Sequence, residues 1–397
     1  MLLFSLFGIL DDKYPEYIDE LNYLVSFTAF CFLLFSKYGF KKVNKSYIDI
    51  NFFSSQRVFS TFSLFYFVLA FLVFLIEGKG LDFANARNNF HETLENRSFI
   101  VGYFRLLSIP LSIYAGSRVI RWLLNLEHYS PLFLITLFLP FFSDSLFSLT
   151  EGGRVAMVYG LLLYILGAAL TLPLSLSFKG KWKLIFVGIL FALLVNFVIS
   201  YIGEVRTTAD GNSEKAQPIK ESLGVFSVFY GGMEYVGSTY VGYQYRRVDA
   251  VEEEYGLGQF TFNGFINWQI PFASRFGLNN ASIAKALDIY YYNQETYDFS
   301  RNYFYFTHSA YLPLIKDFGF KGSFVAIFFL TFLSHYFFVK IQMNNRIQSS
   351  MKFFLFYIFF FYWARSNFYG TLSDSIMIPL YSFLIVDFVN SIFKKKY

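Results

Sequence analysis

The chain has 397 residues, 55% of them hydrophobic and 15% charged, whereas a soluble domain carries about 25% charged residues. The net charge is +5, but the basic residues stand at the ends of apolar stretches, so the charge does not indicate a nucleic-acid partner. The single cysteine, Cys31, lies in an apolar stretch, which excludes an intramolecular disulfide and a cysteine-based metal site.

Repeated apolar stretches of nearly spanning length predict an all-α, polytopic transmembrane helical bundle. Met1–Leu10 is apolar but short and lacks a basic region, so it indicates a half-helix or the remnant of a span rather than a cleavable signal peptide. About nine spans are expected, within a range of eight to ten. In chain order they cover residues 21–36, 58–76, 98–116, 131–149, 154–176, 184–202, 318–339, 353–364 and 375–392.

These spans divide the chain into three parts. Residues 1–202 hold the N-terminal helices with short loops, 203–317 form one large extracytoplasmic loop, and 318–397 hold the C-terminal helices. The large loop contains a polar stretch over 207–218. Three later stretches of it are apolar enough to lie on a membrane surface, at 225–230, 260–272 and 283–292.

The distribution of lysine and arginine predicts the orientation in the membrane. One family of loops is basic and has almost no acid, and the positive-inside rule places these loops and the C-terminus in the cytoplasm. The alternating loops at 77–97, 151–154, 203–310 and 365–374 then face outward. The basic family comprises Lys37, Lys41, Lys42, Lys45, Arg57, Arg118, Arg121, Lys179, Lys181, Lys183, Lys340, Arg346, Lys352 and Lys394–Lys396.

The large outward loop concentrates polar and aromatic side chains. A transport pore keeps most of its polar groups in the helices, whereas an enzyme acting on a lipid-carried substrate places them in a water-facing loop. Guanidinium groups stay charged and bind phosphate oxygens with two parallel hydrogen bonds. Interfacial anchoring remains the alternative for each arginine and tyrosine. Arg206, the first cation after the sixth span, is a catalytic candidate. Candidate substrate-binding residues are Arg246, Arg247, Arg301, Glu204, Glu234 and Tyr305, the last within the tyrosine-rich stretches 230–245 and 290–305.

Two shorter outward turns add arginines. Arg154 follows Gly152 and Gly153 and precedes a helix expected from Val155, where backbone N–H groups attract anions. A helix-end arginine that reaches to the interface gives the same pattern. Arg365 interrupts an aromatic run, and a charge so close to the apolar core generally has a partner or a task.

Proton transfer has two candidates before the seventh span. His308 is the histidine of the large loop, and an imidazole can take a proton from a sugar hydroxyl near neutral pH, although a structural histidine is the alternative. Asp317 either caps the following helix, binds a hydroxyl or orients a base. Asp144 and Asp387 fall inside apolar spans, where a proton path and a helix-packing role are both open.

Several motifs are missing from the chain. The outward loops contain no Asp-x-Asp pair, and the chain has no Walker-type glycine loop, no His-Glu-x-x-His and no Gly-x-Ser-x-Gly. A diphosphate would therefore be held by arginines rather than through a divalent cation. We expect no metal site and no cofactor.

Short motifs over residues 131–340 carry a family resemblance. A Gly-Gly-Arg turn opens a mid-chain span at 152–154, and a Gly-x-x-Arg-Thr exit comes next at 203–207. After the large loop come Thr307, Tyr311-Leu312 and Asp317-Phe318-Gly319-x-x-Gly322. In this layout the chain resembles the bacterial O-antigen and capsule repeat-unit polymerases, often called Wzy-type proteins.

The resemblance implies a GT-C-like membrane glycosyltransferase of the bacterial inner membrane. Such enzymes move a glycan from undecaprenyl diphosphate onto a new lipid-linked repeat unit at the outer face, without a metal. The family's arginines match Arg154 and Arg206, and less directly Arg301; His308 could match the base of the related O-antigen ligases. The implied partners are lipid-linked oligosaccharide donor and acceptor, membrane lipids and a chain-length regulator protein. A ligase of the same superfamily and a flippase of lipid-linked oligosaccharide remain alternatives.

Overall fold

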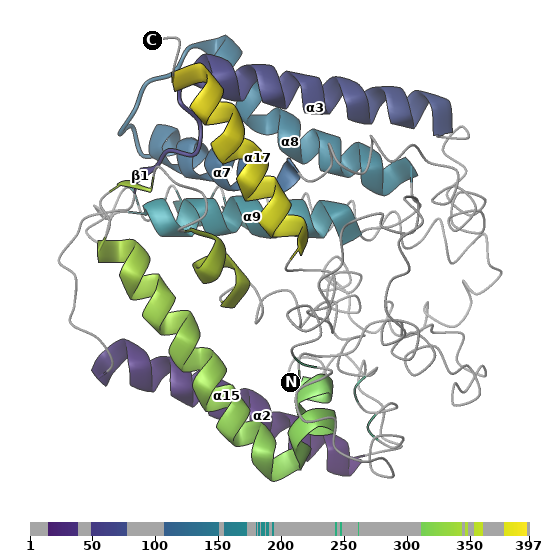
Figure 1. Cartoon of the computed structure of the whole chain (residues 1–397), viewed down its shortest axis with the longest axis vertical. Helices are drawn as coiled ribbons and strands as arrows, with labels where there is room; N and C mark the ends of the chain where they lie inside the picture. Colours follow the sequence, from purple (N-terminus) through teal and green to yellow (C-terminus); the bar gives the residue numbers. More distant parts are fainter. Residues whose placement is uncertain are drawn as a thin grey trace. The chain divides into compact units, whose positions relative to one another are not determined.

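The structure is a computed structural model of the whole chain (Figure 1). The residues it describes are 15–38, 49–77, 107–150, 155–172, 311–343, 346–347, 353–359 and 377–394, with Tyr243, Arg247, Thr261 and isolated positions between 180 and 193. The chain forms two compact units that interleave along the sequence. Unit 1 comprises Met1–Lys42, Lys215–Lys340 and Leu355–Ile378; unit 2 comprises Val43–Glu214, Ile341–Phe354 and Pro379–Tyr397.

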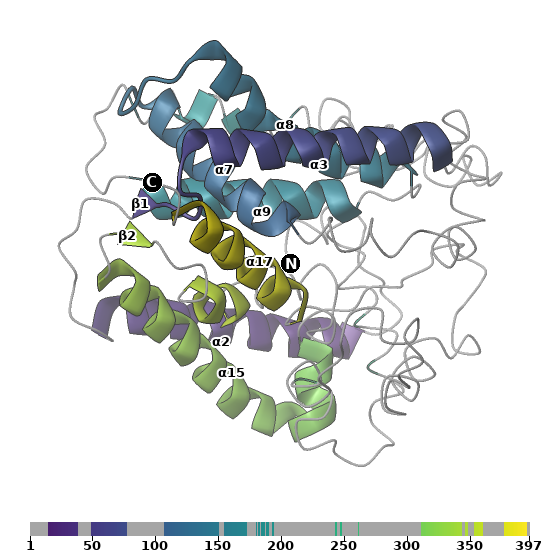
Figure 2. The same cartoon turned by 45° about the horizontal axis from the view of Figure 1, so that its top comes forward.

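Unit 2 is built around four packed helices. They are α3 (Gln56–Glu77), α7 (Ser108–Leu123), α8 (Pro131–Thr150) and α9 (Val155–Thr171), and α3 packs on α8 while α7 packs on α9 (Figures 1 and 2). Gly116 of α7 lies against the backbone of Tyr164, and Gly167 of α9 lies against the backbone of Ile113. Small residues at a helix crossing let the two backbones approach closely, which fixes the α7–α9 contact.

The helix ends of unit 2 are joined by a short parallel sheet. Strand β1 (Asp49–Ile50) pairs with β2 (Arg346–Ile347), Asp49 opposite Arg346. Helix α17 (Met377–Lys394) adds Asn390, whose Oδ1 accepts a hydrogen bond from the backbone N–H of Ser54 at 2.9 Å. Phe52 packs edge-on against Phe353 and Phe383. Segments from two predicted basic loops and the end of the last predicted span thus meet at one end of this unit, as elements on one side of a membrane would.

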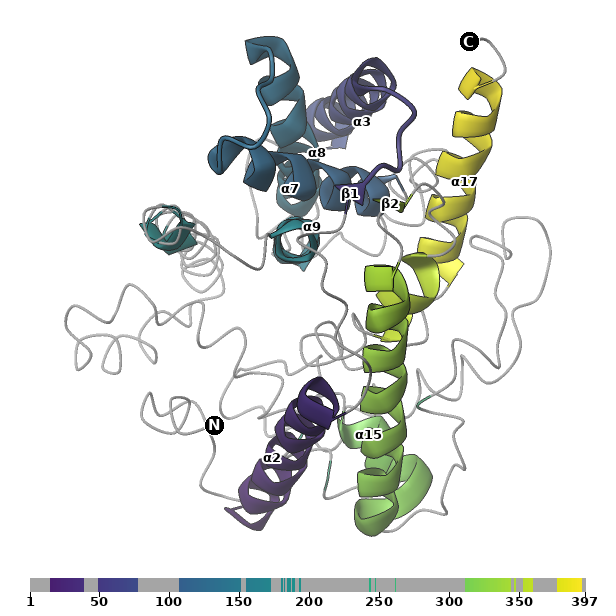
Figure 3. The same cartoon turned by 90° about the vertical axis from the view of Figure 1, so that its left-hand side faces the viewer.

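Unit 1 holds α2 (Pro15–Tyr38) and α15 (Tyr311–Met343), which lie side by side in Figures 2 and 3. Their rings pair in ascending order, Phe27 with Phe324 and Phe35 with Phe328 and Phe332, so α2 and the later part of α15 run in the same direction. The hydroxyl of Tyr311 lies 3.1 Å from Thr28 Oγ1.

Helix α15 is kinked at Gly319. The residue has φ of 66° and ψ of 175°, a conformation that costs a glycine little because it has no Cβ. A short segment from Tyr311 precedes the kink, and the long segment follows it, next to the start at residue 318 that the hydropathy pattern predicts. Lys316 and Asp317, in the short segment, are both buried.

Among the described residues, four helices are long and apolar enough to cross a membrane. These stretches are Glu16–Ser36, Gln56–Ile76, Pro131–Thr150 and Tyr311–Ile341, with shorter apolar helices at Tyr159–Thr171 and Leu380–Ile392. Helix α3 exposes large apolar side chains such as Phe65, Leu72 and Ile76, as expected for a surface in contact with lipid. The expectation of an all-α membrane protein is confirmed. The predicted span at 98–116 is described only from residue 107, where α7 covers its second half, and the predicted span at 184–202 falls largely outside the described residues.

Candidate functional site

Two of the predicted site residues, Arg247 and Asp317, are among those the structure describes, and both belong to unit 1. The others lie outside the described residues and stay predictions, as does the division of the chain at 202 and 317. They are His308, Arg206, Arg154, Arg246, Arg301, Arg365, Glu204, Glu234 and Tyr305.

Arg247 forms an ion pair with Glu20 of α2. Its Nε donates to Glu20 Oε1 at 2.7 Å and its Nη2 to Oε2 at 3.3 Å. The hydroxyl of Tyr243 donates to the same Oε1 at 2.6 Å, and the guanidinium lies 5.6 Å from the centre of the Tyr17 ring. The side chains of Arg247 and Glu20 are 12% and 14% exposed. The contacts therefore fasten the predicted outer loop to the first turns of α2.

Charge and burial act together in this cluster. Burial opposes the charge of Arg247, but the hydrogen bond and charge of Glu20 outweigh it, so the pKa of Arg247 is raised. The pKa of Tyr243 is raised well above its ordinary value, first by burial and then by the neighbouring Glu20 carboxylate. Arg247 thus remains a cation and Tyr243 a neutral hydroxyl. Because Glu20 takes two of its nitrogens, the geometry favours a positioning role for Arg247; its contact with substrate stays a prediction.

Asp317 fastens the predicted outer loop to α15. The carboxylate is fully buried, and its Oδ2 accepts a hydrogen bond from the backbone N–H of Thr261 at 2.5 Å. Asp317 stands two residues before the kink at Gly319, after which the long segment of α15 begins. Its role as a cap of that segment, as a ligand of a hydroxyl or as the orienter of a base stays a prediction, and its contact with Thr261 adds a role in holding the predicted loop.

Unit 2 contains a cluster of four charges that sequence reasoning missed. Asp49 and Glu127 each form an ion pair with both Arg118 and Arg121. The guanidinium nitrogens of Arg121 lie 2.9 Å from an Asp49 oxygen and 2.6 Å from a Glu127 oxygen. Those of Arg118 lie 3.4 Å from Asp49 and 3.2 Å from Glu127. The few acids of the predicted basic loops include Asp49 and Glu127, and both are used in this cluster. Two carboxylates balance the two arginines, so this end of α7 is close to neutral. In the sequence Asp49 stands between apolar neighbours, and this pattern was the signal from which a paired carboxylate could have been predicted.

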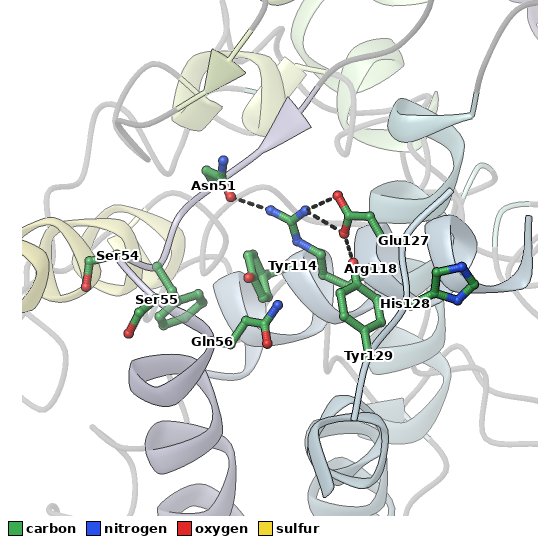
Figure 4. Close-up of a pocket in the computed structure, with 10 residues that line it drawn as sticks. Asn51, Ser54, Ser55, Gln56, Tyr114, Arg118, Glu127, His128 and Tyr129 are labelled. Carbon is green, nitrogen blue, oxygen red and sulfur yellow. Dashed lines mark hydrogen bonds and ion pairs between the residues drawn. The ribbon is translucent and has the colours of Figure 1, made fainter. Parts of the chain in front are cut away.

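A pocket of about 340 Å³ adjoins this cluster (Figure 4). Arg118 lines it, but its Nη atoms are taken by Glu127, Asp49, Asn51 and the carbonyl of Ile50. Burial alone would lower the pKa of Arg118, but the neighbouring Tyr114, Glu127 and Asp49 outweigh that effect, so the pKa is raised. The guanidinium therefore organises the wall of the pocket. The lining residues are Asn51, Phe53, Ser54, Ser55, Gln56, Tyr114, Arg118, Glu127, His128 and Tyr129.

Within the described ranges, no three histidine, cysteine or carboxylate side chains gather as a metal ion would need. Compared with known families, curated proteins and solved structures, the chain matches none. The fold and the contacts of the described residues define a helical membrane protein in which carboxylates of α2 and α15 hold parts of the predicted outer loop.

Proposed function

We propose that this protein is a membrane glycosyltransferase that polymerises undecaprenyl-diphosphate-linked oligosaccharide repeat units into O-antigen or capsular polysaccharide. It would act at the outer face of the bacterial inner membrane with a GT-C-like architecture. The motifs at 152–154, 203–207 and 307–322 suggest this class. Donor and acceptor would both be lipid-linked glycans, and a chain-length regulator protein would be a further partner.

The observation that carries the proposal is the double attachment of the predicted outer loop. Residues 243 and 247 bind Glu20 of α2, and residue 261 binds Asp317 of α15. Glu20 lies near the start of α2, and Asp317 stands two residues before the kink of α15. A passive linker has no need of buried ionic contacts. A loop that must present side chains to a lipid-linked substrate requires such fixed points.

In the proposed reaction, a base removes the proton from an acceptor hydroxyl, and that oxygen attacks the anomeric carbon of the donor glycan. The bond from this carbon to the diphosphate oxygen breaks, and undecaprenyl diphosphate leaves with the bonding electrons. Arg154 and Arg206, with Arg301 or Arg365, would neutralise the charge developing on the diphosphate. His308 would act as the base, with a carboxylate such as Glu204, Glu234 or Asp317 as the alternative. Tyrosines such as Tyr305 would hold the sugars.

Two alternatives have distinct predictions. An O-antigen ligase would use the same donor chemistry and differ in the acceptor, to which it transfers finished glycan. A flippase would keep charged residues along a central cavity and have short loops. The attached loop segments count against the flippase, because a flippase has no evident use for them.

The test is a gel of surface glycan from a strain in which this gene is deleted and then restored. A polymerase gives glycan capped with one repeat unit after deletion and a ladder after restoration. Loss of all surface glycan, with polymer retained on the carrier, would identify a ligase; single units trapped inside would identify a flippase. Restoration with Arg206→Ala is expected to give no ladder at normal protein level. Restoration with Arg57→Ala, an exposed arginine at the start of α3, is the matched control and should give the full ladder.

A further inference from the structure

Asp144 is a buried carboxylate within the membrane-spanning helix α8 of unit 2. The hydroxyl of Tyr66, from α3, donates to Oδ1 at 2.7 Å. The hydroxyl of Ser108, from α7, lies 2.9 Å from Oδ1 and 2.8 Å from Oδ2. Gly160 of α9 lies directly against the carboxylate, since a Cβ there would be 2.5 Å from Oδ2. Four helices therefore meet at this one polar group.

Two further hydroxyls in the same unit are buried without any hydrogen-bond partner among the described residues: those of Ser63 and Ser112. Each side chain is fully buried. Ser63 precedes Tyr66 by one turn of α3, and Ser112 follows Ser108 by one turn of α7, so each shares a helix face with a residue that binds Asp144. Unpaired hydroxyls thus stand on both helices that hold the carboxylate.

The two serines belong to the same layer. Phe59, near the start of α3, packs against Tyr114 in the second half of α7, whereas Tyr66 and Ser108 meet at Asp144. Helices α3 and α7 therefore run in opposite directions. One turn back along α3 and one turn forward along α7 both lead away from Asp144 toward the same end of the bundle.

Helix α8 contributes a proline on the same side. Pro140 precedes Asp144 by one turn and has no N–H, so it cannot donate the helical hydrogen bond to the carbonyl of Thr136. Helix α8 runs parallel to α3, because Ser60 meets Thr136 at 3.0 Å while Tyr66 meets Asp144. The proline therefore lies toward the same end as Ser63 and Ser112.

We infer that ordered water occupies this layer, bridging Ser63 on α3 and Ser112 on α7 and extending the hydroxyl network of Asp144, Tyr66 and Ser108. Buried polar groups in proteins are almost always paired with protein or with water, and a buried water generally makes about three hydrogen bonds. Two serine hydroxyls and the Asp144 network offer that number. This site is separate from the proposed glycosyl transfer, which concerns the outer loop.

Radiolytic hydroxyl-radical footprinting of the full-length protein in detergent tests the inference. Ionised internal water oxidises the side chains beside it, so Tyr66 is expected to be oxidised several-fold faster than Tyr164. Tyr164 is the native control, because it is also buried and its hydroxyl is already paired, donating to the Leu137 carbonyl at 2.6 Å. Equal and low oxidation of both tyrosines would mean a dry layer and would overturn the inference.

The double variant Ser63→Ala/Ser112→Ala supplies the second arm. Removing both partners of the water should bring Tyr66 oxidation down to the level of Tyr164 and lower the melting temperature. A higher melting temperature would instead show that the hydroxyls were dry and unpaired. Ser145→Ala, at a serine whose hydroxyl bonds to the Phe141 carbonyl, is the matched control and should leave Tyr66 oxidation unchanged. Loss of Tyr66 oxidation on adding sodium would assign the layer to a cation and overturn the water assignment.

Discussion

Arg247 donates two hydrogen bonds to Glu20 across 227 positions of sequence. The first helix of the described chain and a residue of the predicted outer loop are therefore parts of one folded unit. This pair, rather than any covalent neighbour, determines where the backbone around Arg247 lies. Its loss should affect the attachment of the loop before it affects the helices.

Glu20→Ala tests this attachment. The variant leaves the Arg247 charge buried without its carboxylate, and breaking a buried ion pair costs about 3–5 kcal/mol. We expect a loss of that size in the free energy of unfolding, measured by SDS titration in detergent. Glu16→Ala, at an exposed position of the same helix, should stay within about 0.5 kcal/mol of the parent. A parent-like Glu20→Ala protein would mean that the pair contributes nothing to the fold.

Asp317 can be tested for anchoring and for proton transfer separately. Asp317→Ala leaves the Thr261 N–H without its acceptor, which costs about 1–3 kcal/mol when the group is buried. Asp317→Asn keeps an acceptor oxygen, so we expect a smaller loss of stability and a retained glycan ladder. If Asp317→Asn unfolds like the parent yet gives no ladder, the carboxylate is the base rather than an anchor.

Arg118 holds the four-charge cluster of unit 2. Arg118→Ala is expected to cost about 3 kcal/mol, the lower end for a buried pair, because Asp49 and Glu127 are each about a quarter exposed. Unfolding in detergent measures the change, and the exposed Arg57→Ala variant should be close to neutral. Addition of Glu127→Gln should recover part of the loss, since it removes one of the unbalanced carboxylates. No recovery in that double variant would contradict the assigned pairing.

The α7–α9 crossing depends on Gly116. Gly116→Ala places a methyl group into the backbone of Tyr164, and overpacking of this kind costs about 1–3 kcal/mol. Gly188→Ala is the matched control, because a Cβ there meets nothing within 4 Å. We expect a lower melting temperature for the first variant and an unchanged or raised one for the second. Equal melting temperatures would contradict the close approach of α7 and α9.

The sequence by itself determined the class of this protein. Hydropathy is a local property of about 20 residues, so the predicted spans at 58–76 and 131–149 agree closely with α3 (Gln56–Glu77) and α8 (Pro131–Thr150). The same local pattern placed the start of a span at residue 318, next to the kink at Gly319, and did not predict the short buried segment before it, which contains Lys316 and Asp317.

The partners of the charged groups were decided only by the tertiary structure. Glu20 and Arg247, Thr261 and Asp317, and Asp49 and Arg118 are far apart in sequence, and no periodicity or motif connects them. Whether a charge binds a substrate, anchors a loop or neutralises its neighbour depends on what packing brings within about 4 Å of it. The residue types in the sequence named the candidate site residues. The three-dimensional contacts then showed which of the described candidates hold the predicted loop in place, while the remaining candidates keep their predicted contact with substrate.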